Sequence, residues 1–264
     1  MSALSKPAPA GDVDYAQHGQ GYAARRRPDP RIAARVHQAL GDARTVLNVG
    51  AGAGSYEPED RHVIAIEPSE TMRAQRPRHL TQAINAVAEQ LPLDDQSVDA
   101  SMALTTVHQW RDLEKGLSEL RRVTRGPIVV LTFDGDALEL YWLAKYAPEL
   151  ITVERRRYPR IERIANGLGG SVNVEVIPIP IDCVDGFTEA FYARPEAFLD
   201  ADVRRSQSAW SFVSEADQLR FVQRLGDDLK SGAWDRQYGD WRKKPSFEGS
   251  LRLVVSDHRH EMAS

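Results

Sequence analysis

Short apolar runs alternate with amphipathic segments through the first half of the chain. Runs rich in Val, Ile and Leu predict strands, whereas apolar residues spaced three and four positions apart predict helices. The predicted strands cover residues 45–49, 63–67, 83–87, 97–104 and 127–133. The predicted helices cover residues 30–40, 69–75 and 113–123. Strands that alternate with helices in this way indicate an α/β fold, with a parallel sheet and helices on both of its faces.

Capping residues mark where two of these helices begin. Asp29 precedes Pro30, and aspartate is a favoured N-cap while proline suits the first helical turn. Ser69 is expected to cap the helix at 69–75, which Pro77 ends because proline cannot continue a helix.

The pattern changes after residue 133 and becomes mainly helical. Helices are predicted at residues 137–146, 158–168, 195–199 and 215–229. The segment 172–181 alternates apolar and polar residues but holds prolines at 178 and 180, which is typical of an edge strand. A final strand is predicted at 249–255.

The glycine-rich turn after the strand at 45–49 carries the strongest chemical signal. Gly50, Gly52 and Gly54 alternate with alanines, and the next predicted strand ends at Glu67, 13 positions after Gly54. Glycines let the backbone approach a ligand closely, and a carboxylate can accept hydrogen bonds from both hydroxyls of a ribose. Together the two segments predict a site for a cofactor that contains adenosine.

The spacing within the turn distinguishes between cofactors. A dinucleotide fingerprint has the order G-x-G-x-x-G and places a pyrophosphate at a helix N-terminus. This chain has G-x-G-x-G, followed by Glu57 and Glu59, whose carboxylates would oppose a pyrophosphate. S-adenosylmethionine carries a positively charged sulfonium and meets no such repulsion. The turn therefore favours S-adenosylmethionine over NAD.

Four segments stand in a characteristic order along the chain. They are the glycine turn with Glu67, then residues 88–99 (AEQLPLDDQSVD), 103–110 (ALTTVHQW) and 120–127 (LRRVTRGP). In this order they resemble the class I S-adenosylmethionine-dependent methyltransferases. The likeness covers residues 15–135 well and is nearest to the small-molecule group, which includes the ubiquinone/menaquinone, trans-aconitate and malonyl-carrier-protein methyltransferases. It implies a Rossmann-like, doubly wound, mostly parallel seven-stranded sheet with an antiparallel final strand and a helical insertion after strand five.

The resemblance also implies roles for individual residues. Arg27 would belong to an N-terminal segment that closes over the cofactor and would pair with its methionine carboxylate. Glu67 would hold the ribose, and Met72 would either cover the adenine or belong to the core. The residues expected to bind the cofactor are Tyr22, Arg27, Asn48, Gly50, Ala51, Gly52, Glu67, Pro68, Met72, Ala88, Glu89, Ala103 and Leu104.

His108 is the candidate for a catalytic base. It follows the strand at 97–104, and imidazole titrates near neutrality. A base is needed only where the methyl acceptor arrives protonated. Alternatively, His108 shapes the pocket or caps a helix. The segment 183–192, which joins aromatic and acidic residues, either floors the acceptor pocket or packs late helices onto the sheet.

Two positions depart from the family pattern. Asn48 replaces the acidic residue that usually stands two places before the first glycine, so hydrogen bonding is kept but the charge is lost. Val87 replaces the aspartate that usually contacts adenine, which leaves that contact to backbone groups or to Glu89. Both changes would weaken affinity for the cofactor, and neither removes the glycine turn or Glu67.

Length and composition indicate how the rest of the chain is organised around this site. A chain of 264 residues suffices for one domain with a modest insertion. We expect a mobile tail at 1–14 and a single domain at 15–264. Within that domain we expect an N-terminal helical lid, a cofactor-binding core, and an acceptor-side insertion with late strands, at residues 15–44, 45–135 and 137–245.

Charge and cysteine content limit the classes of partner and the cellular compartment that are expected. The net charge of −4 argues against a nucleic-acid partner, and the chain lacks the run of eighteen apolar residues that a membrane span needs. The single Cys183 suits a reducing compartment, so a cytoplasmic protein is expected. His258 and His260 have a spacing that metal ligands can have, but no metal site is predicted.

These observations predict a methyltransferase that acts on a small organic molecule, with oxygen as the favoured acceptor atom. Two alternatives stay open: a non-catalytic protein that binds S-adenosylmethionine, and an NAD-dependent oxidoreductase. The sequence does not specify the acceptor or the oligomeric state.

Overall fold

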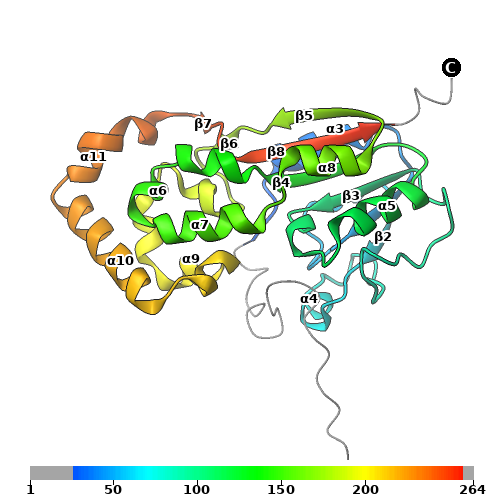
Figure 1. Cartoon of the computed structure of the whole chain (residues 1–264), viewed down its shortest axis with the longest axis horizontal. Coiled ribbons are helices and arrows are strands. Elements are labelled where there is room, and N and C mark those ends of the chain that lie inside the picture. Colours follow the sequence, from blue (N-terminus) through cyan, green and yellow to red (C-terminus); the bar gives the residue numbers. More distant parts are fainter. Residues whose placement is uncertain (1–25, 258–264) are drawn as a thin grey trace, which may run out of the picture.

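A computed structural model describes residues 26–257 and shows a six-stranded sheet in the order β2-β1-β3-β4-β8-β5 (Figure 1). Four neighbouring strands, β2, β1, β3 and β4, run parallel, and β8 is antiparallel to both β4 and β5. The strands are β1 (Thr45–Val49), β2 (His62–Ile66), β3 (Ala100–Leu104), β4 (Ile128–Phe133), β5 (Ser171–Val176) and β8 (Leu251–Asp257). A separate antiparallel pair joins β6 (Ile179–Pro180) to β7 (Ser246–Phe247).

The predicted fold class is confirmed, but the expected seventh strand of the sheet is absent from the described residues. The segment 83–87 makes only isolated bridges, one of them between Ile66 and Ile84. Ile84 and Val87 are exposed, so the segment gains little apolar burial from longer pairing at the sheet edge. Its β-branched residues predicted a strand, and the lack of a buried face explains why none forms.

Helices surround the sheet and continue into a large helical region. The α-helices are α3 (Pro30–Ala39), α4 (Glu70–Ala74), α5 (Leu113–Val123), α6 (Leu143–Tyr146), α7 (Pro148–Arg157), α8 (Ile161–Leu168), α9 (Ala201–Arg205), α10 (Glu215–Lys230) and α11 (Ala233–Tyr238). The 3-10 helices are η1 (Val107–Gln109), η2 (Gly135–Leu140), η3 (Thr188–Phe191), η4 (Pro195–Leu199), η5 (Ser208–Phe212) and η6 (Gly239–Lys243).

Local signals fix several boundaries of these elements. The side chains of Asp29 and Ser69 accept hydrogen bonds from backbone N–H groups at the starts of α3 and α4, which confirms both predicted N-caps. The predicted helix at 158–168 begins later, at Ile161, because the residue before a proline favours extended backbone and Tyr158, before Pro159, has a ψ of 125°. Pro178 likewise separates β5 from β6 within the predicted strand at 172–181.

Both faces of the sheet are covered, because neighbouring residues of a strand point to opposite sides. Val46 of β1 belongs to an apolar cluster with Ile32 and Val36 of α3. Leu47, the next residue, belongs to a second cluster, which includes Leu117 of α5. The sheet is therefore the central layer of the fold, as the alternation of strands and helices predicted.

The helices that follow β4 form a second body of structure beside the sheet. Figure 1 shows α6, α7, α9, α10 and α11 gathered at one end of the molecule. Trp142 lies at their centre and makes edge-to-face contacts with Tyr146, Phe198 and Trp234, at centroid distances of 5.8, 5.9 and 5.5 Å. This aromatic packing is continuous with the apolar cluster on the α3 side of the sheet, so the insertion and the sheet share one core.

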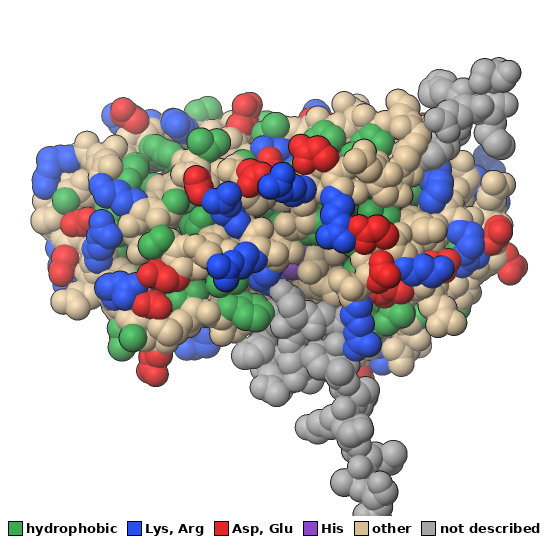
Figure 2. Space-filling model, in the orientation of Figure 1, with side chains coloured by type: hydrophobic (Ala, Val, Ile, Leu, Met, Phe, Trp, Pro, Cys, Tyr) green, Lys and Arg blue, Asp and Glu red, His purple; other side chains and the backbone are tan. Residues whose placement is uncertain are grey.

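Charges of both signs are interspersed over the face of the molecule in Figure 2. Many form surface ion pairs, such as Arg163 with Glu114 at 2.6 Å and Arg220 with Glu149 at 2.5 Å. Exposed pairs of this kind contribute little to stability. Among the described helices, none has the length and apolar character needed to cross a membrane.

Candidate cofactor and acceptor site

The glycine turn follows β1 in a conformation that only glycine adopts without strain. Gly50, Gly52 and Gly54 have φ angles of +70°, +52° and +95°. A Cβ atom on Gly50 would lie 2.0 Å from Oγ1 of Thr106, so the turn is pressed against the segment after β3. The amides of Gly50 and Ala51 both donate to the carbonyl of Ile66 at 2.9 Å, which joins the turn to the end of β2.

Glu67 stands directly after β2 and faces this turn. Its carboxylate accepts hydrogen bonds from the amides of Gly52 and Ser69, both at 2.8 Å, and the residue is only 7% exposed. Burial raises the pKa of Glu67 above its usual value, while the two amide donors favour the charged form. A carboxylate has about four acceptor positions, so capacity remains for ribose hydroxyls.

Met72 is a further predicted cofactor residue that lies beside this turn. Met72 of α4 is buried, and its Cε atom would lie 3.3 Å from a Cβ atom on Gly52, so a side chain at Gly52 would close the space beside the turn. Ala51, Ala88, Ala103 and Leu104 are buried, and Pro68 is half-buried. These placements fit a cofactor with an apolar adenine and a hydroxylated ribose.

Three predicted residues are placed differently from what their proposed roles suggest. The Oε1 atom of Glu89 accepts from the amides of Arg111 and Asp112 at 2.7 and 3.1 Å, so that oxygen already has two donors. Asn48 is buried and donates to Glu57 at 2.9 Å. Arg27 is exposed. Tyr22 lies outside the described residues.

Arg26, next to Arg27, is the arginine that lines an internal space. Its Nε donates to Oδ1 of Asp185 at 2.6 Å, and the Tyr56 hydroxyl donates to the other oxygen of Asp185 at 2.7 Å. Asp185 is 3% exposed, so these contacts compensate a buried carboxylate. They attach the segment before α3 to the insertion. The sequence analysis assigned a binding role to Arg27, whereas the member of this pair that turns inwards is Arg26.

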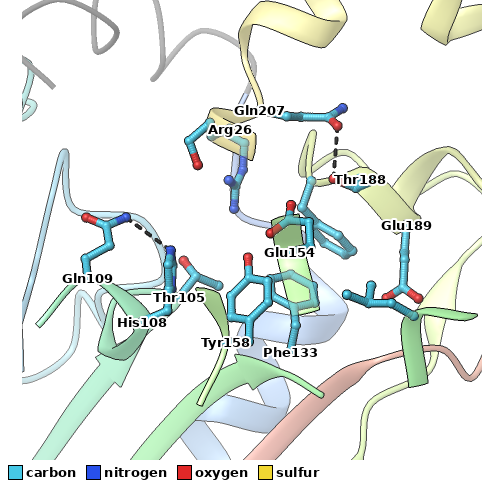
Figure 3. Close-up of a pocket in the computed structure, with 13 residues that line it drawn as sticks. Arg26, Thr105, His108, Gln109, Phe133, Glu154, Tyr158, Thr188, Glu189 and Gln207 are labelled. Carbon is cyan, nitrogen blue, oxygen red and sulfur yellow. Dashed lines mark hydrogen bonds between the residues drawn. The ribbon is translucent and has the colours of Figure 1, made fainter. Parts of the chain in front are cut away.

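A cavity opens beside His108, between the sheet and the insertion, with about 510 Å³ of empty space when open solvent is included. Thr105 lines the cavity, and the adjacent Thr106 packs against Gly50 of the glycine turn. In Figure 3, Arg26, Glu154 and Tyr158 point toward a common space near His108. The lining residues are Arg26, Thr105, His108, Gln109, Phe133, Leu138, Glu154, Tyr158, Phe187, Thr188, Glu189, Gln207 and Ser208.

Thr105 marks the edge of this cavity with an unusual backbone. Its φ angle is +52°, in the left-handed region that β-branched residues rarely adopt, and its amide donates to the carbonyl of Leu131 at 2.7 Å. Such strain persists only where the surroundings hold it, and it is concentrated at functional sites.

The surroundings of His108 disfavour its charged form. Burial lowers its pKa well below 6.5, and the positive charges of Arg157 and Arg26 lower it further. Its ring lies edge-on to Tyr158, with 4.7 Å between centroids. Nε2 lies 3.3 Å from the side-chain nitrogen of Gln109, and the buried Nδ1 has no hydrogen-bond partner among residues 26–257.

Several cavity residues carry no signal in the sequence. Glu154 belongs to α7, a helix that the pattern did not predict, and Tyr158 follows α7 at the start of the predicted helix 158–168. Glu189 lies within the segment 183–192, for which both a pocket floor and a packing role were considered. It does both, because it lines the cavity and also accepts from the amide and hydroxyl of Ser250. Burial raises the pKa of Glu189 to about 7.

Known proteins with this arrangement identify the family. Residues 47–127 match the model of a family described as a methyltransferase domain. The crystal structure of a proposed methyltransferase from an antibiotic biosynthesis pathway of Anabaena variabilis ATCC 29413 is 30% identical to this chain. The two superpose with a TM-score of 0.82, over 88% of this chain and 98% of that one. The chain belongs to the class I S-adenosylmethionine-dependent methyltransferases.

Other relatives extend this assignment. An S-adenosylmethionine-dependent methyltransferase of Thermotoga maritima has the same fold, with a TM-score of 0.54 and 16% identity over 92% of this chain and 96% of that one. An uncharacterized methyltransferase of Mycobacterium tuberculosis is 36% identical over 91 residues. That match covers 31% of this chain and 36% of the relative, so the chain matches about a third of the curated relative's length.

The family's cofactor, S-adenosylmethionine, agrees with the cofactor predicted from the glycine spacing. The family assignment also excludes the alternative of an NAD-dependent oxidoreductase. The glycine turn at Gly50 and Gly52, whose Gly52 amide donates to the Glu67 carboxylate, is the feature of this chain that suits the cofactor.

Proposed function

We propose that this protein transfers the methyl group of S-adenosylmethionine to an oxygen atom of a small organic molecule held in the cavity beside His108. The observation that carries the proposal is that the cavity and the glycine turn lie next to each other. Thr105 and Thr106, adjacent in the chain, touch the acceptor cavity and the glycine turn respectively. A molecule in the cavity would therefore lie next to the methionyl end of a cofactor bound at Gly50 and Gly52.

The residues around Glu67 are proposed to hold the cofactor. Glu67 would accept from the ribose hydroxyls, Gly50 and Gly52 would allow close backbone approach, and Met72 would pack on an apolar part. When bound, S-adenosylmethionine supplies a methyl group on a good leaving group. The protein's task is then to align the acceptor and exclude water.

The cavity suits a small acceptor with apolar and polar parts. Phe133, Leu138 and Phe187 provide apolar surface, and polar side chains such as Thr188 and Gln207 lie among them. The relative from Anabaena variabilis, assigned to an antibiotic biosynthesis pathway, supports a small-molecule substrate as well.

The state of His108 favours a hydroxyl acceptor. A hydroxyl must lose its proton as it is methylated, and a neutral imidazole can take that proton. Burial lowers the pKa of His108, so the ring is unprotonated near neutral pH, and the same shift makes it a weaker base than a free imidazole. Nδ1 would accept the proton, with Nε2 protonated toward the Gln109 amide once that amide turns its oxygen to the ring.

The proposal is tested with the purified full chain in two steps. Isothermal titration measures S-adenosylmethionine binding, and a panel of phenols, alcohols, carboxylic acids and amines is then screened for release of S-adenosylhomocysteine. Mass spectrometry identifies the methylated atom. We expect binding and an O-methylated product. Folded protein that does not bind the cofactor contradicts the whole proposal, and methylation confined to nitrogen or carbon contradicts the choice of oxygen. Cofactor binding without turnover across the panel favours the non-catalytic alternative.

A further inference from the structure

The strand that leads into the glycine turn carries an amide where a carboxylate is expected, and a second residue brings a carboxylate back to the same place. Asn48 of β1 is 2% exposed. Its side-chain nitrogen donates to Oε1 of Glu57 at 2.9 Å. Glu57 lies nine positions later in the chain, on the far side of the glycine turn. The negative charge missing from β1 is therefore present one hydrogen bond away.

Glu57 is also part of a buried ion pair with Arg76. The NH2 nitrogen of Arg76 donates to the two oxygens of Glu57, at 3.0 and 2.9 Å. The two side chains are only 1% and 3% exposed, so solvent screens their charges weakly. A buried pair contributes little net stability, but removing one partner leaves an uncompensated charge and is strongly unfavourable.

The pair is connected to the turn that carries Gly52. The NH1 nitrogen of Arg76 lies 3.4 Å from the carbonyl oxygen of Gly52, and its other donors reach the carbonyl of Thr81. A Cβ atom on Gly54 would lie 3.3 Å from NH1 of Arg76 and 3.6 Å from Oε2 of Glu57. Asn48, Glu57 and Arg76 thus support the turn from beneath.

We propose that Glu57 is a positioning residue for the cofactor: acting through Asn48 and Arg76, it fixes the glycine turn and balances charge beneath the methionyl end. The inference rests on the proposed function for the identity of the ligand. Its basis is electrostatic. S-adenosylmethionine carries two positive charges and one negative charge, whereas S-adenosylhomocysteine lacks the sulfonium charge and is neutral overall. A net positive charge beneath the turn would therefore disfavour the first ligand more than the second.

Glu57→Gln tests this by leaving Arg76 without its carboxylate. We expect S-adenosylmethionine affinity to fall on the order of tenfold more than S-adenosylhomocysteine affinity, as for unit charges roughly 10 Å apart in a partly buried site. Both dissociation constants are measured by isothermal titration, beside thermal unfolding of each variant. The control is Glu59→Gln, which removes an exposed carboxylate two positions away and should leave both constants unchanged.

A second variant moves the carboxylate back to the strand. Asn48→Asp combined with Glu57→Gln keeps one negative charge beside Arg76, and should restore the ratio of the two dissociation constants to within about threefold of the parent's. If Glu57→Gln alone does not fold, the ratio of the two dissociation constants in the double variant tests the proposal. A folded Glu57→Gln protein with an unchanged ratio, or an exchanged variant whose ratio is not restored, overturns the proposal.

These outcomes are separate from the test of the proposed function. An unaltered chain that binds no S-adenosylmethionine defeats the proposed function before any variant is compared. An unaltered chain that binds it while Glu57→Gln behaves like the parent defeats only the positioning role. A loss of thermal stability with no change in the ratio assigns the three residues to structural support alone and also overturns the proposal.

Discussion

Gly50→Ala is expected to destabilise the protein through one defined contact. The new Cβ atom would lie 2.0 Å from Oγ1, 2.7 Å from Cβ and 2.8 Å from Cγ2 of Thr106. It would also force alanine to a φ of +70°, which costs about 1–2 kcal/mol. Relieving the overlap adds about 1–3 kcal/mol. The free energy of unfolding should therefore fall by roughly 2–5 kcal/mol.

Gly41→Ala provides the matched control. Gly41 also has a positive φ, +57°, but a Cβ atom there would meet nothing within 4 Å. The backbone strain and the gain from restricting the unfolded chain are similar in the two variants. Urea denaturation of both therefore isolates the contact with Thr106, which we expect to account for a difference of about 1–3 kcal/mol.

Removing the obstruction should recover part of this loss. Thr106→Ala deletes Oγ1 and Cγ2, so the double variant with Gly50→Ala should be less destabilised than the sum of the two single variants. Equal destabilisation by Gly50→Ala and Gly41→Ala, together with simple additivity in the double variant, would refute the close packing of the turn against the end of β3.

Three further predictions concern the cavity. His108→Asn keeps a hydrogen-bonding group but takes up no proton. Turnover of a hydroxyl acceptor should therefore fall about 10²- to 10⁴-fold, while the cofactor dissociation constant stays unchanged. An unaltered rate would contradict the base role. Because the Glu189 pKa is raised from 4.5 to about 7, its contribution to the free energy of unfolding should decrease by roughly 2–4 kcal/mol as pH rises from about 4.5 to 7. Urea denaturation at pH 5 and pH 8 should show that Glu189→Gln lacks this slope, and an identical slope would contradict the shift. Arg26→Gln should raise the acceptor KM, because Arg26 lines the cavity and compensates buried Asp185, whereas Arg27→Gln should not; equal effects would argue against this assignment.

The glycine turn and Glu67 were predictable because both signals are local in the sequence. A strand that ends in glycines, and a second strand that ends in an acid, meet at one edge of a parallel sheet. The structure shows that contact directly, from Gly52 to Glu67. The strand expected at 83–87 was wrong for the opposite reason, since its local propensity does not report how little of it is buried.

The cavity that we propose for the acceptor was less predictable because distant segments build it. Glu154 and Tyr158 reach it only after the insertion packs on the sheet, and no residue spacing in the sequence predicts such contacts. Arg26 and Arg27 are adjacent, so a shift of one residue decides which side chain turns inwards. Glu57 was considered as a charge near the ligand, whereas the structure shows that it turns beneath the glycine turn toward Asn48 and Arg76.

Titration of S-adenosylmethionine into the folded full chain and into Glu67→Ala tests the central claim most directly. The control is Glu70→Ala, three positions on, where the side chain is exposed. We predict that the parent and the control bind alike, and that Glu67→Ala binds roughly tenfold to a hundredfold more weakly, because charged hydrogen bonds to the ribose are lost. No binding to the parent, or equal affinity in Glu67→Ala, would contradict the account.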